Sequence, residues 1–316
     1  MKKILLATTM LAGTAGFAAA EGAVALSGSA EMGIWSDAYG DLQFWQDVEV
    51  KFTMSGTTDG GLEFGAVIDL DETNVDAASG QDYPSAYNDD SGTSVYISGS
   101  FGKLTLGDTD GALDWALADM DNGLTSITDD HTTHVAWFGG SDMDGKAGAD
   151  GQILRYENTF GAFGFAVSLE QADEGEGLVD DTFGIGVKYT ANLGGTDVNL
   201  GLGYQDSGDR DGSAIGVSAA ATFGGAFTGK IGYISFDDSS RNLDSHIGAE
   251  LTYVSGPIGV GVNYGKVEQV VGDSYDSWGA VANYDLGGGA KVEFGYGSDV
   301  NGLGDDQWSL GIGMSF

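Results

Sequence analysis

The sequence predicts an all-β fold, a 16-stranded antiparallel up-and-down transmembrane β-barrel. Three observations predict it. Apolar and polar residues alternate with a period of two in sixteen segments of the chain. Most of these segments run about nine to thirteen residues, which suits a tilted strand crossing a bilayer, whereas strands of soluble proteins usually have about five or six. The connections between segments alternate between short and long.

The chain opens with a segment typical of exported proteins. Lys2 and Lys3 precede an apolar run from Ile4, and Ala18 to Ala20 form a small-residue cleavage pattern. The run is too short and too interrupted by Thr and Gly for a spanning helix of about 20 residues, and the alternative of a buried N-terminal helix leaves both ends of the pattern unexplained. Residues 1–20 are therefore predicted to be a cleaved signal peptide, and residues 21–316 a single barrel domain.

Composition and charge narrow the function classes. The chain has 55 Gly, 2 Pro and no Cys, and 41% of its residues are hydrophobic, so it is apolar enough to fold but forms neither disulfides nor thiolate metal sites. Without residues 1–20 the mature chain keeps 10 basic against 48 acidic side chains, a net charge of −38. Such a charge excludes nucleic acid as a partner, because binding to phosphates requires many cations.

The alternation is clearest in two neighbouring segments. From Gln43 to Met54, Phe44, Val48 and Val50 share one face while Asp47, Glu49 and Lys51 share the other. The segment from Leu62 repeats this pattern, with Phe64, Ala66 and Ile68 on the apolar face and Asp69 and Asp71 on the polar face. Fourteen further segments start near Val24, Thr93, Lys103, Gln152, Phe163, Thr182, Thr196, Ser213, Phe227, His246, Ile258, Ser277, Lys291 and Trp308.

The connections indicate a meander with two different ends. Tight Gly-rich turns such as FGAF, LGGTD and DLGGGA alternate with longer acidic stretches such as EQADEGEGLVDD. Short turns at one end and long loops at the other are typical of outer-membrane barrels. Aromatic residues cluster near the tight turns and the C-terminus, where an interfacial girdle would lie; they are Tyr189, Phe223, Phe227, Tyr253, Tyr284 and Phe316.

Closure of the sheet follows from the properties of lipid. Unpaired backbone groups at a sheet edge cannot be satisfied in a bilayer, so the last segment must pair with the first. A barrel of sixteen strands is too wide to be filled by side chains, and its mostly small or polar inward residues predict an aqueous channel.

Three stretches resemble a known family: FTMSGTTDGGLEFGA at 52–66, ISGSFGKLTLGD at 97–108 and YDLGGGA at 284–290. They are similar to the general porins of Rhodobacter-type bacteria. The resemblance implies an outer-membrane location in a Gram-negative bacterium, a homotrimer of 16-stranded barrels, and passive diffusion of small hydrophilic solutes. It also implies a long third extracellular loop folded into the lumen as a constriction.

In this chain that loop corresponds to residues 107–151, the longest gap between segments. The stretch DGALDWALADM at 110–120 has Asp110 as a candidate helix N-cap, with Leu113, Leu117 and Met120 at helical spacing. We expect a short helix packed on the inner wall. The carboxylates expected to line the passage are Asp108, Asp110, Asp114, Asp119 and Asp121.

The wall opposite the loop departs from the family pattern. The resemblance implies basic residues on the second and third strands, but the chain has Asp47, Glu49, Asp69 and Asp71 there, with Lys51 as the one cation. Arg155 alternates inward and is expected to supply a further cation. Because rings of carboxylates favour cations, the hypothesis is a cation-preferring pore.

Metal sites have weaker support. His131 and His134 have the spacing of two ligands, but no third ligand is fixed and the stretch lacks a helical pattern. His246 is expected to hydrogen-bond in the lumen. Asp142, Asp144 and Asp150 do not fit an EF-hand loop but could hold calcium, the one candidate cofactor, against the alternative of a solvated acidic loop.

Two other function classes fit the sequence less well. An outer-membrane barrel enzyme, a lipase or protease, needs a nucleophile, a base and an acid, and Ser126 with His131 or His134 is the one candidate set, so the chain is not expected to be an enzyme. A secreted soluble acidic β-protein does not explain the segment lengths or the asymmetric connections.

The terminal Phe316 resembles the ending by which outer-membrane barrels are recognised by the barrel-assembly machinery. A weaker feature points to subunit contact, since the outward residues Gly28, Ala30, Ala66 and Gly99 are small enough to allow close approach of a neighbour.

Overall fold

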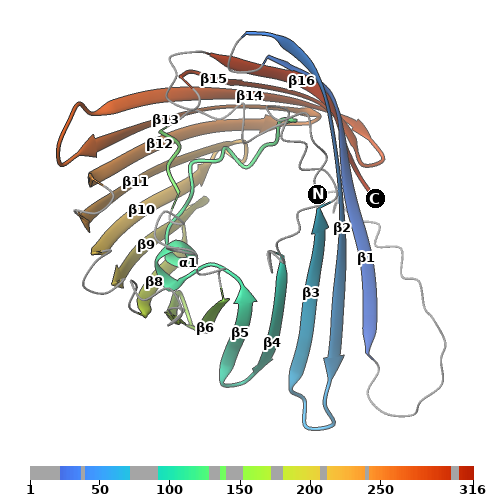
Figure 1. Cartoon of the computed structure of the whole chain (residues 1–316). Coiled ribbons are helices and arrows are strands. Elements are labelled where there is room, and N and C mark those ends of the chain that lie inside the picture. Colours follow the sequence, from blue (N-terminus) through green and yellow to red (C-terminus); the bar gives the residue numbers. More distant parts are fainter. Residues whose placement is uncertain are drawn as a thin grey trace.

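The structure is a closed antiparallel barrel in which each strand pairs with the next along the chain and β16 returns to β1 (Figure 1). It is a computed structural model, and it describes residues 22–36, 40–71, 92–127, 136–139, 152–171, 181–206, 212–238, 242–299 and 306–316. The signal-peptide prediction for residues 1–20 lies outside this part of the chain. The predicted meander of sixteen strands is confirmed.

The strand bounds are β1 Ala23–Ser36, β2 Leu42–Thr57, β3 Glu63–Asp71, β4 Thr93–Gly99, β5 Gly102–Asp108, β6 Gln152–Phe160, β7 Phe163–Glu170, β8 Thr182–Leu193, β9 Thr196–Asp206, β10 Ser213–Phe223, β11 Phe227–Asp238, β12 Leu243–Ser255, β13 Ile258–Gln269, β14 Tyr275–Gly287, β15 Ala290–Gly297 and β16 Gln307–Ser315. A short helix, α1, covers Ala112–Ala116. No helix in the described ranges is long and apolar enough to cross a membrane.

The strands vary more in length than the pattern predicts. β4 and β5 have 7 residues each, whereas β2 has 16. β12 begins at Leu243, whereas the alternation predicts a start near His246. A register shift between Leu243 and Ser245 interrupts the alternation, so the pattern does not reveal the first residues of the strand. A bulge places two residues of one strand opposite one of its partner, and this hides the period of two.

The two ends of the chain close the barrel. β1 pairs with β16 with Ala30 opposite Met314 and Ile34 opposite Leu310. Beyond the strand, the Phe316 amide donates to the Gly28 carbonyl at 2.8 Å. The first and last strands are therefore hydrogen-bonded to each other from Gly28 to Ser36, which closes the sheet as an apolar environment requires.

The two faces of the wall differ as the alternation predicts. On β16, Leu310 and Ile312 are exposed on the outer face, whereas Gln307, Ser309 and Gly311 are buried on the inner face. Outward apolar residues recur on strand after strand, and no residue of the described ranges covers them. An exposed apolar belt that encircles the barrel is the surface expected to contact lipid acyl chains.

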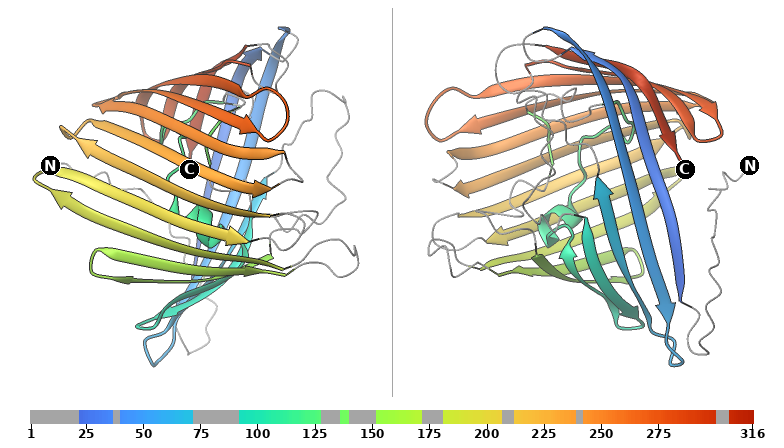
Figure 2. Two further views of the ribbon diagram at one scale, coloured as in Figure 1. Left: turned by 90° about the vertical axis from the view of Figure 1, so that its left-hand side faces the viewer. Right: turned by 45° about the vertical axis from the view of Figure 1, so that its right-hand side comes forward.

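Tight turns join the strands at one end, and aromatic side chains gather beside them. In the β8–β9 turn, Gly194 and Gly195 take φ values of 66° and 97°, a region that residues with a Cβ rarely adopt. Near these turns the rings of Phe163 and Tyr189 lie 5.0 Å apart, and those of Phe227 and Tyr253 4.8 Å. Figure 2 shows the tilted strands side by side.

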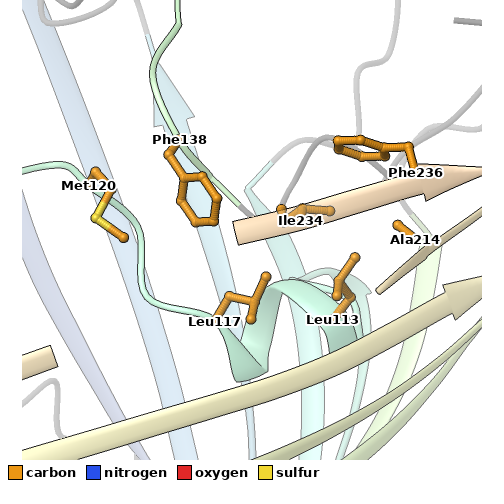
Figure 3. Packing of buried hydrophobic residues seen from close by; sticks show 7 residues of the cluster. All are labelled: Leu113, Leu117, Met120, Phe138, Ala214, Ile234 and Phe236. Carbon is orange, nitrogen blue, oxygen red and sulfur yellow. The ribbon is translucent and has the colours of Figure 1, made fainter. Parts of the chain in front are cut away.

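The main apolar cluster among the described residues lies inside the barrel. It joins the segment after β5 to the inner face of β10 and β11 (Figure 3), and its members are Leu113, Leu117, Met120, Phe138, Ala214, Ile234 and Phe236. The core of this protein is therefore the contact between a loop and the lumen wall.

Candidate pore constriction

The segment that follows β5 enters the barrel and packs on its inner wall. α1 contacts β7, β8 and β9, and it lies within the ring of strands in Figure 1. Leu113 and Leu117 pack against the wall, as their helical spacing predicts. The helix is only five residues long, shorter than the predicted stretch of residues 110–120.

The prediction that Asp110 caps this helix is wrong. The N-cap is Gly111, and no side chain bonds to the first turn as a cap. The free amide of Ala112 instead donates to Ser168 Oγ of β7 at 2.8 Å. A wall residue thus satisfies one of the donors that a helix start leaves unpaired, while Asp110 bonds to Arg155.

Inward-facing glycines form the surface on which the loop lies, and the sequence reading missed this role. At each of them a Cβ would lie within about 3.3 Å of a loop atom. They follow the wall from β7 to β13 and reappear on β16 and β1; they are Gly164, Gly184, Gly186, Gly201, Gly203, Gly216, Gly232, Gly248, Gly259, Gly261, Gly265, Gly311 and Gly33. The signal was present as glycine at every second position in stretches such as FGIGVKY and LGLGY.

The part of the loop near Ile127 reaches the place where β1 and β16 pair and close the barrel. Ile127 is fully buried, and its side chain packs against Gly33 of β1 and Gly311 of β16. Residues 136–138 lie further back on β11 to β13, where Phe138 contacts Gly232 and Gly248. The described part of the loop therefore lines the wall from β6 round to β1.

Arg155 anchors the first part of the loop. Its Nη1 donates to the Asp110 carbonyl at 2.6 Å and lies 3.4 Å from the Asp110 carboxylate, while its Nε donates to Glu157 at 2.9 Å. The side chain points inward, as predicted, but is only 8% exposed. Two carboxylates and the loop therefore surround this cation.

Lys230 of β11 and Glu250 of β12 anchor the middle of the loop. They are cross-strand partners, and Lys230 Nζ lies 3.2 Å from the Glu250 carboxylate and 2.6 Å from that of Asp121. Glu250 also accepts the Asn122 amide at 2.7 Å. Asn122 takes a left-handed φ of 64°, and Thr252 Oγ1 donates to its carbonyl at 3.0 Å.

A third anchor lies on β14 and β15. Asn283 Nδ2 donates to the Thr125 carbonyl at 2.5 Å and its Oδ1 accepts the Thr125 amide at 3.2 Å. Thr125 Oγ1 donates to Glu293 at 2.5 Å, and Lys291 Nζ lies 2.9 Å from the same carboxylate oxygen. Both backbone groups of Thr125 and its hydroxyl are thus held by the wall.

The wall of β2 and β3 carries the predicted acids on its inner face. Asp47, Glu49, Lys51 and Asp69 have the lumen-facing parity, and the side chains of Lys51 and Asp69 are 47% and 26% exposed. Lys51 Nζ lies 2.5 Å from the carboxylate of Asp69, its cross-strand partner. The one cation of this wall is therefore ion-paired.

The barrel register brings like charges opposite one another on this wall. Glu31 of β1, which the sequence reading did not select, is the backbone partner of Asp47. Glu49 is the partner of Asp71, whose backbone lies in β3 but whose side chain lies outside the described set. Glu49 also accepts the Ser29 hydroxyl at 2.8 Å. Directly opposed like charges on adjacent strands repel.

The predicted carboxylates of the loop differ in their exposure and in the groups that they contact. Asp110 and Asp121 stay 60% and 53% exposed while contacting Arg155 and Lys230, respectively. Asp108 ends β5, and its carboxylate accepts the Gly92 amide. Asp114 and Asp119 are half-buried. Asp110, Asp114, Asp119 and Asp121 thus lie on the loop within the barrel, whereas Asp108 has the outward parity of Leu104 and Leu106 on β5, which contradicts its expected place in the passage.

The other candidate residues do not add a second site to this part of the structure. His246 is buried, and its Nε2 lies 3.0 Å from the Ala136 carbonyl, so the expected hydrogen bond is made to the loop. Ser126 is buried beside Ile127. His131, His134, Asp142, Asp144 and Asp150 lie outside the described residues.

Comparisons with known proteins agree with this geometry. Residues 7–302 match the Gram-negative porin family. The chain is 31% identical over 292 residues to a porin of Rhodobacter capsulatus, covering 85% of this chain and 92% of that protein. A porin structure refined at 1.8 Å resolution superposes with a TM-score of 0.72 at 27% identity, covering 93% of this chain and 100% of the other.

A variant of the Rhodopseudomonas blastica porin superposes with a TM-score of 0.66 over 93% of this chain and all of its own, and at 18% identity it supports the fold alone. With the closed 16-stranded barrel, the apolar outer belt and the inward loop, these matches lead to one assignment. The chain belongs to the Gram-negative porin family and is a multi-pass channel protein of the outer membrane.

Proposed function

We propose that the channel lets small hydrophilic solutes diffuse passively and that it prefers cations. The observation that carries this proposal is the charge of the wall opposite the loop. Asp47 and Glu49 stand there on the inner face of β2 beside Lys51, and Lys51 is paired with Asp69. The fold and family are those of a channel rather than of an enzyme.

The physical basis is the potential of a narrow passage between two acidic surfaces. The loop presents Asp110 and Asp121, both more than half exposed, and the facing wall presents carboxylates opposed in register. Low-dielectric walls concentrate the field of these charges in the water between them. Screening is incomplete over a Debye length of about 8 Å at physiological ionic strength. A passing cation lowers the repulsion between the carboxylates, whereas an anion raises it.

Reversal potentials in a KCl gradient across a planar bilayer test this proposal. The unaltered channel is expected to show a potential of the sign set by cations. A combined Asp47→Asn, Glu49→Gln, Asp69→Asn and Asp71→Asn variant is expected to move the potential toward that of anions. Asp59→Asn, in the exposed β2–β3 turn, is the matched control and is expected to change nothing. An anion-directed potential of the unaltered channel would refute the proposal.

We further propose that the barrel assembles as a homotrimer through its early strands. Gly28 and Ala30 of β1 and Ala66 of β3 have the outward parity and are small, so a neighbouring barrel could approach closely there. The mass of the purified protein in detergent, measured by light scattering, tests this. Ala30→Trp is expected to reduce the trimer fraction, and a monomer mass for the unaltered protein would contradict the proposal.

A further inference from the structure

Two of the lysines on the inner wall are paired with glutamates beneath the loop, and their positive charges would by themselves oppose the proposed cation preference. Lys230 of β11 and Lys291 of β15 both carry the inward parity, and the loop passes over both. An inward lysine in a porin lumen would repel cations and attract anions. Their surroundings decide whether permeating ions experience that charge.

Each lysine is paired with a glutamate that is sealed from water. Lys230 lies 3.2 Å from Glu250, whose side chain is 0% exposed. Lys291 lies 2.9 Å from Glu293, whose side chain is 1% exposed. The lysines themselves are 16% and 33% exposed. In both pairs the carboxylate is the more deeply buried member, and Lys230 also lies 2.6 Å from the carboxylate of Asp121 on the loop.

Uncharged donors from the loop and from β12 complete the two pairs. The Asn122 amide donates to Glu250 at 2.7 Å and the Thr252 hydroxyl at 3.1 Å. The Thr125 hydroxyl donates to Glu293 at 2.5 Å. A buried carboxylate is tolerated only when it is paired and hydrogen-bonded, and here the loop supplies part of what is needed. The glutamates therefore hold the lysine charges and the loop in one arrangement.

We infer that Glu250 and Glu293 are specificity-determining residues, because they neutralise the wall cations Lys230 and Lys291 beneath the loop, whose charges would otherwise repel permeating cations. Each lysine–glutamate pair has no net charge, so its electrostatic potential in the lumen falls off with distance faster than that of a single charge. The inference deepens the proposed cation preference and rests on it for its functional meaning, but its test depends only on changes relative to the unaltered channel.

A double-mutant cycle that removes the charges of Lys230 and Glu250 singly and together tests the inference. Glu250→Gln keeps an acceptor for the Asn122 amide and removes the negative charge, so the cation-to-anion permeability ratio is expected to fall. Lys230→Gln is expected to raise the ratio. A unit charge about 10 Å from the ion path changes the ratio by about twofold at low ionic strength. The double variant Lys230→Gln/Glu250→Gln is expected to return to the unaltered ratio.

Conductance in about 1 M KCl separates charge from shape, because the Debye length there is about 3 Å and wall charges are screened. The glutamine variants are expected to keep the unaltered conductance under these conditions, since the loop stays in place. Heat-modifiable migration in detergent gels confirms that each variant is folded. The pair Lys291→Gln and Glu293→Gln, with its double variant, repeats the cycle at an independent position if a change at Glu250 prevents folding.

Opposite shifts for the single variants and recovery in the double variant support the inference. It is overturned if the double variant shifts as far as Lys230→Gln alone, because the lysine charge would then already reach the ions. The inference is also overturned if the conductance in high salt changes by the same fraction as the permeability ratio. The glutamates would then act only by holding the loop in place. An anion-preferring unaltered channel would refute the proposed function, while the cycle would still decide the role of the pairs.

Discussion

A methyl carbon placed on Gly203 of β9 would lie 2.7 Å from Cδ1 of Leu113 and 2.9 Å from its Cα. The loop backbone thus rests directly on the strand backbone, with no room for a side chain between them. The loop can approach the wall this closely only because the inward positions beneath it are glycines.

Gly203→Ala is therefore expected to displace α1 toward the lumen and to change the pore conductance. Overpacking of this kind typically destabilises by about 1 to 3 kcal/mol, so the loop should shift rather than compress. Single-channel conductance in high salt measures the change. Gly229→Ala on β11 is the control, because the nearest atoms to its Cβ would lie 3.8 Å away. Equal conductance for the Gly203 variant and the control would contradict the prediction.

Removal of Arg155 should loosen the start of the loop. Arg155→Gln loses the bond to the Asp110 carbonyl, and hydrogen bonds from charged donors contribute about 1.5 to 3 kcal/mol. We expect larger current fluctuations in single-channel recordings. Asp110→Asn should have a small effect, because its carboxylate is 60% exposed and 3.4 Å away while its carbonyl still accepts. Quiet recordings from the Arg155 variant would show that the other two anchors suffice.

The two faces of β16 should respond differently to the same substitution. Ile312→Arg places a charge in the apolar belt, which costs about 2 to 4 kcal/mol near the bilayer midplane, so the barrel should unfold at lower temperature or fail to insert. Gly311→Arg points inward against Ile127 and should instead lower the conductance. Thermal unfolding in detergent, together with conductance, separates the two outcomes. Equal thermal loss from both variants would contradict the assigned faces.

The sequence predicted the features that repeat locally. The alternation along β2 and β16 assigned each side chain to a face, and pairing rules then required β1 to meet β16. The acids on β2 and β3 followed from the same alternation. Glu31 has the same inward parity on β1, but only the strand register shows that it lies opposite Asp47.

The path of the loop could not be predicted, because its contacts join residues far apart in the chain. Asn122 bonds to Glu250, and Thr125 to Glu293, and no local pattern relates them. Local spacing predicts Asp110 as a helix cap, whereas in the structure Asp110 is held by Arg155, which is distant in the chain. Glycine at every second position marked the surface for the loop, but it also fits any strand that needs small residues.

Deletion of Phe316 should impair assembly more than the stability of the finished barrel. The side chain is 76% exposed on the outer surface, so it adds little packing, while its backbone pairs with Gly28 beyond the end of β16. Phe316→Ala retains that backbone pairing and removes only the ring. If the ring is the element recognised by the barrel-assembly machinery, both variants should show reduced amounts in outer-membrane fractions. Refolding of the same variants from urea into detergent should be nearly normal, as judged by heat-modifiable migration. Normal membrane levels of Phe316→Ala would show that the ring is not the recognised feature, and failure of both variants to refold would assign the residue to barrel closure instead.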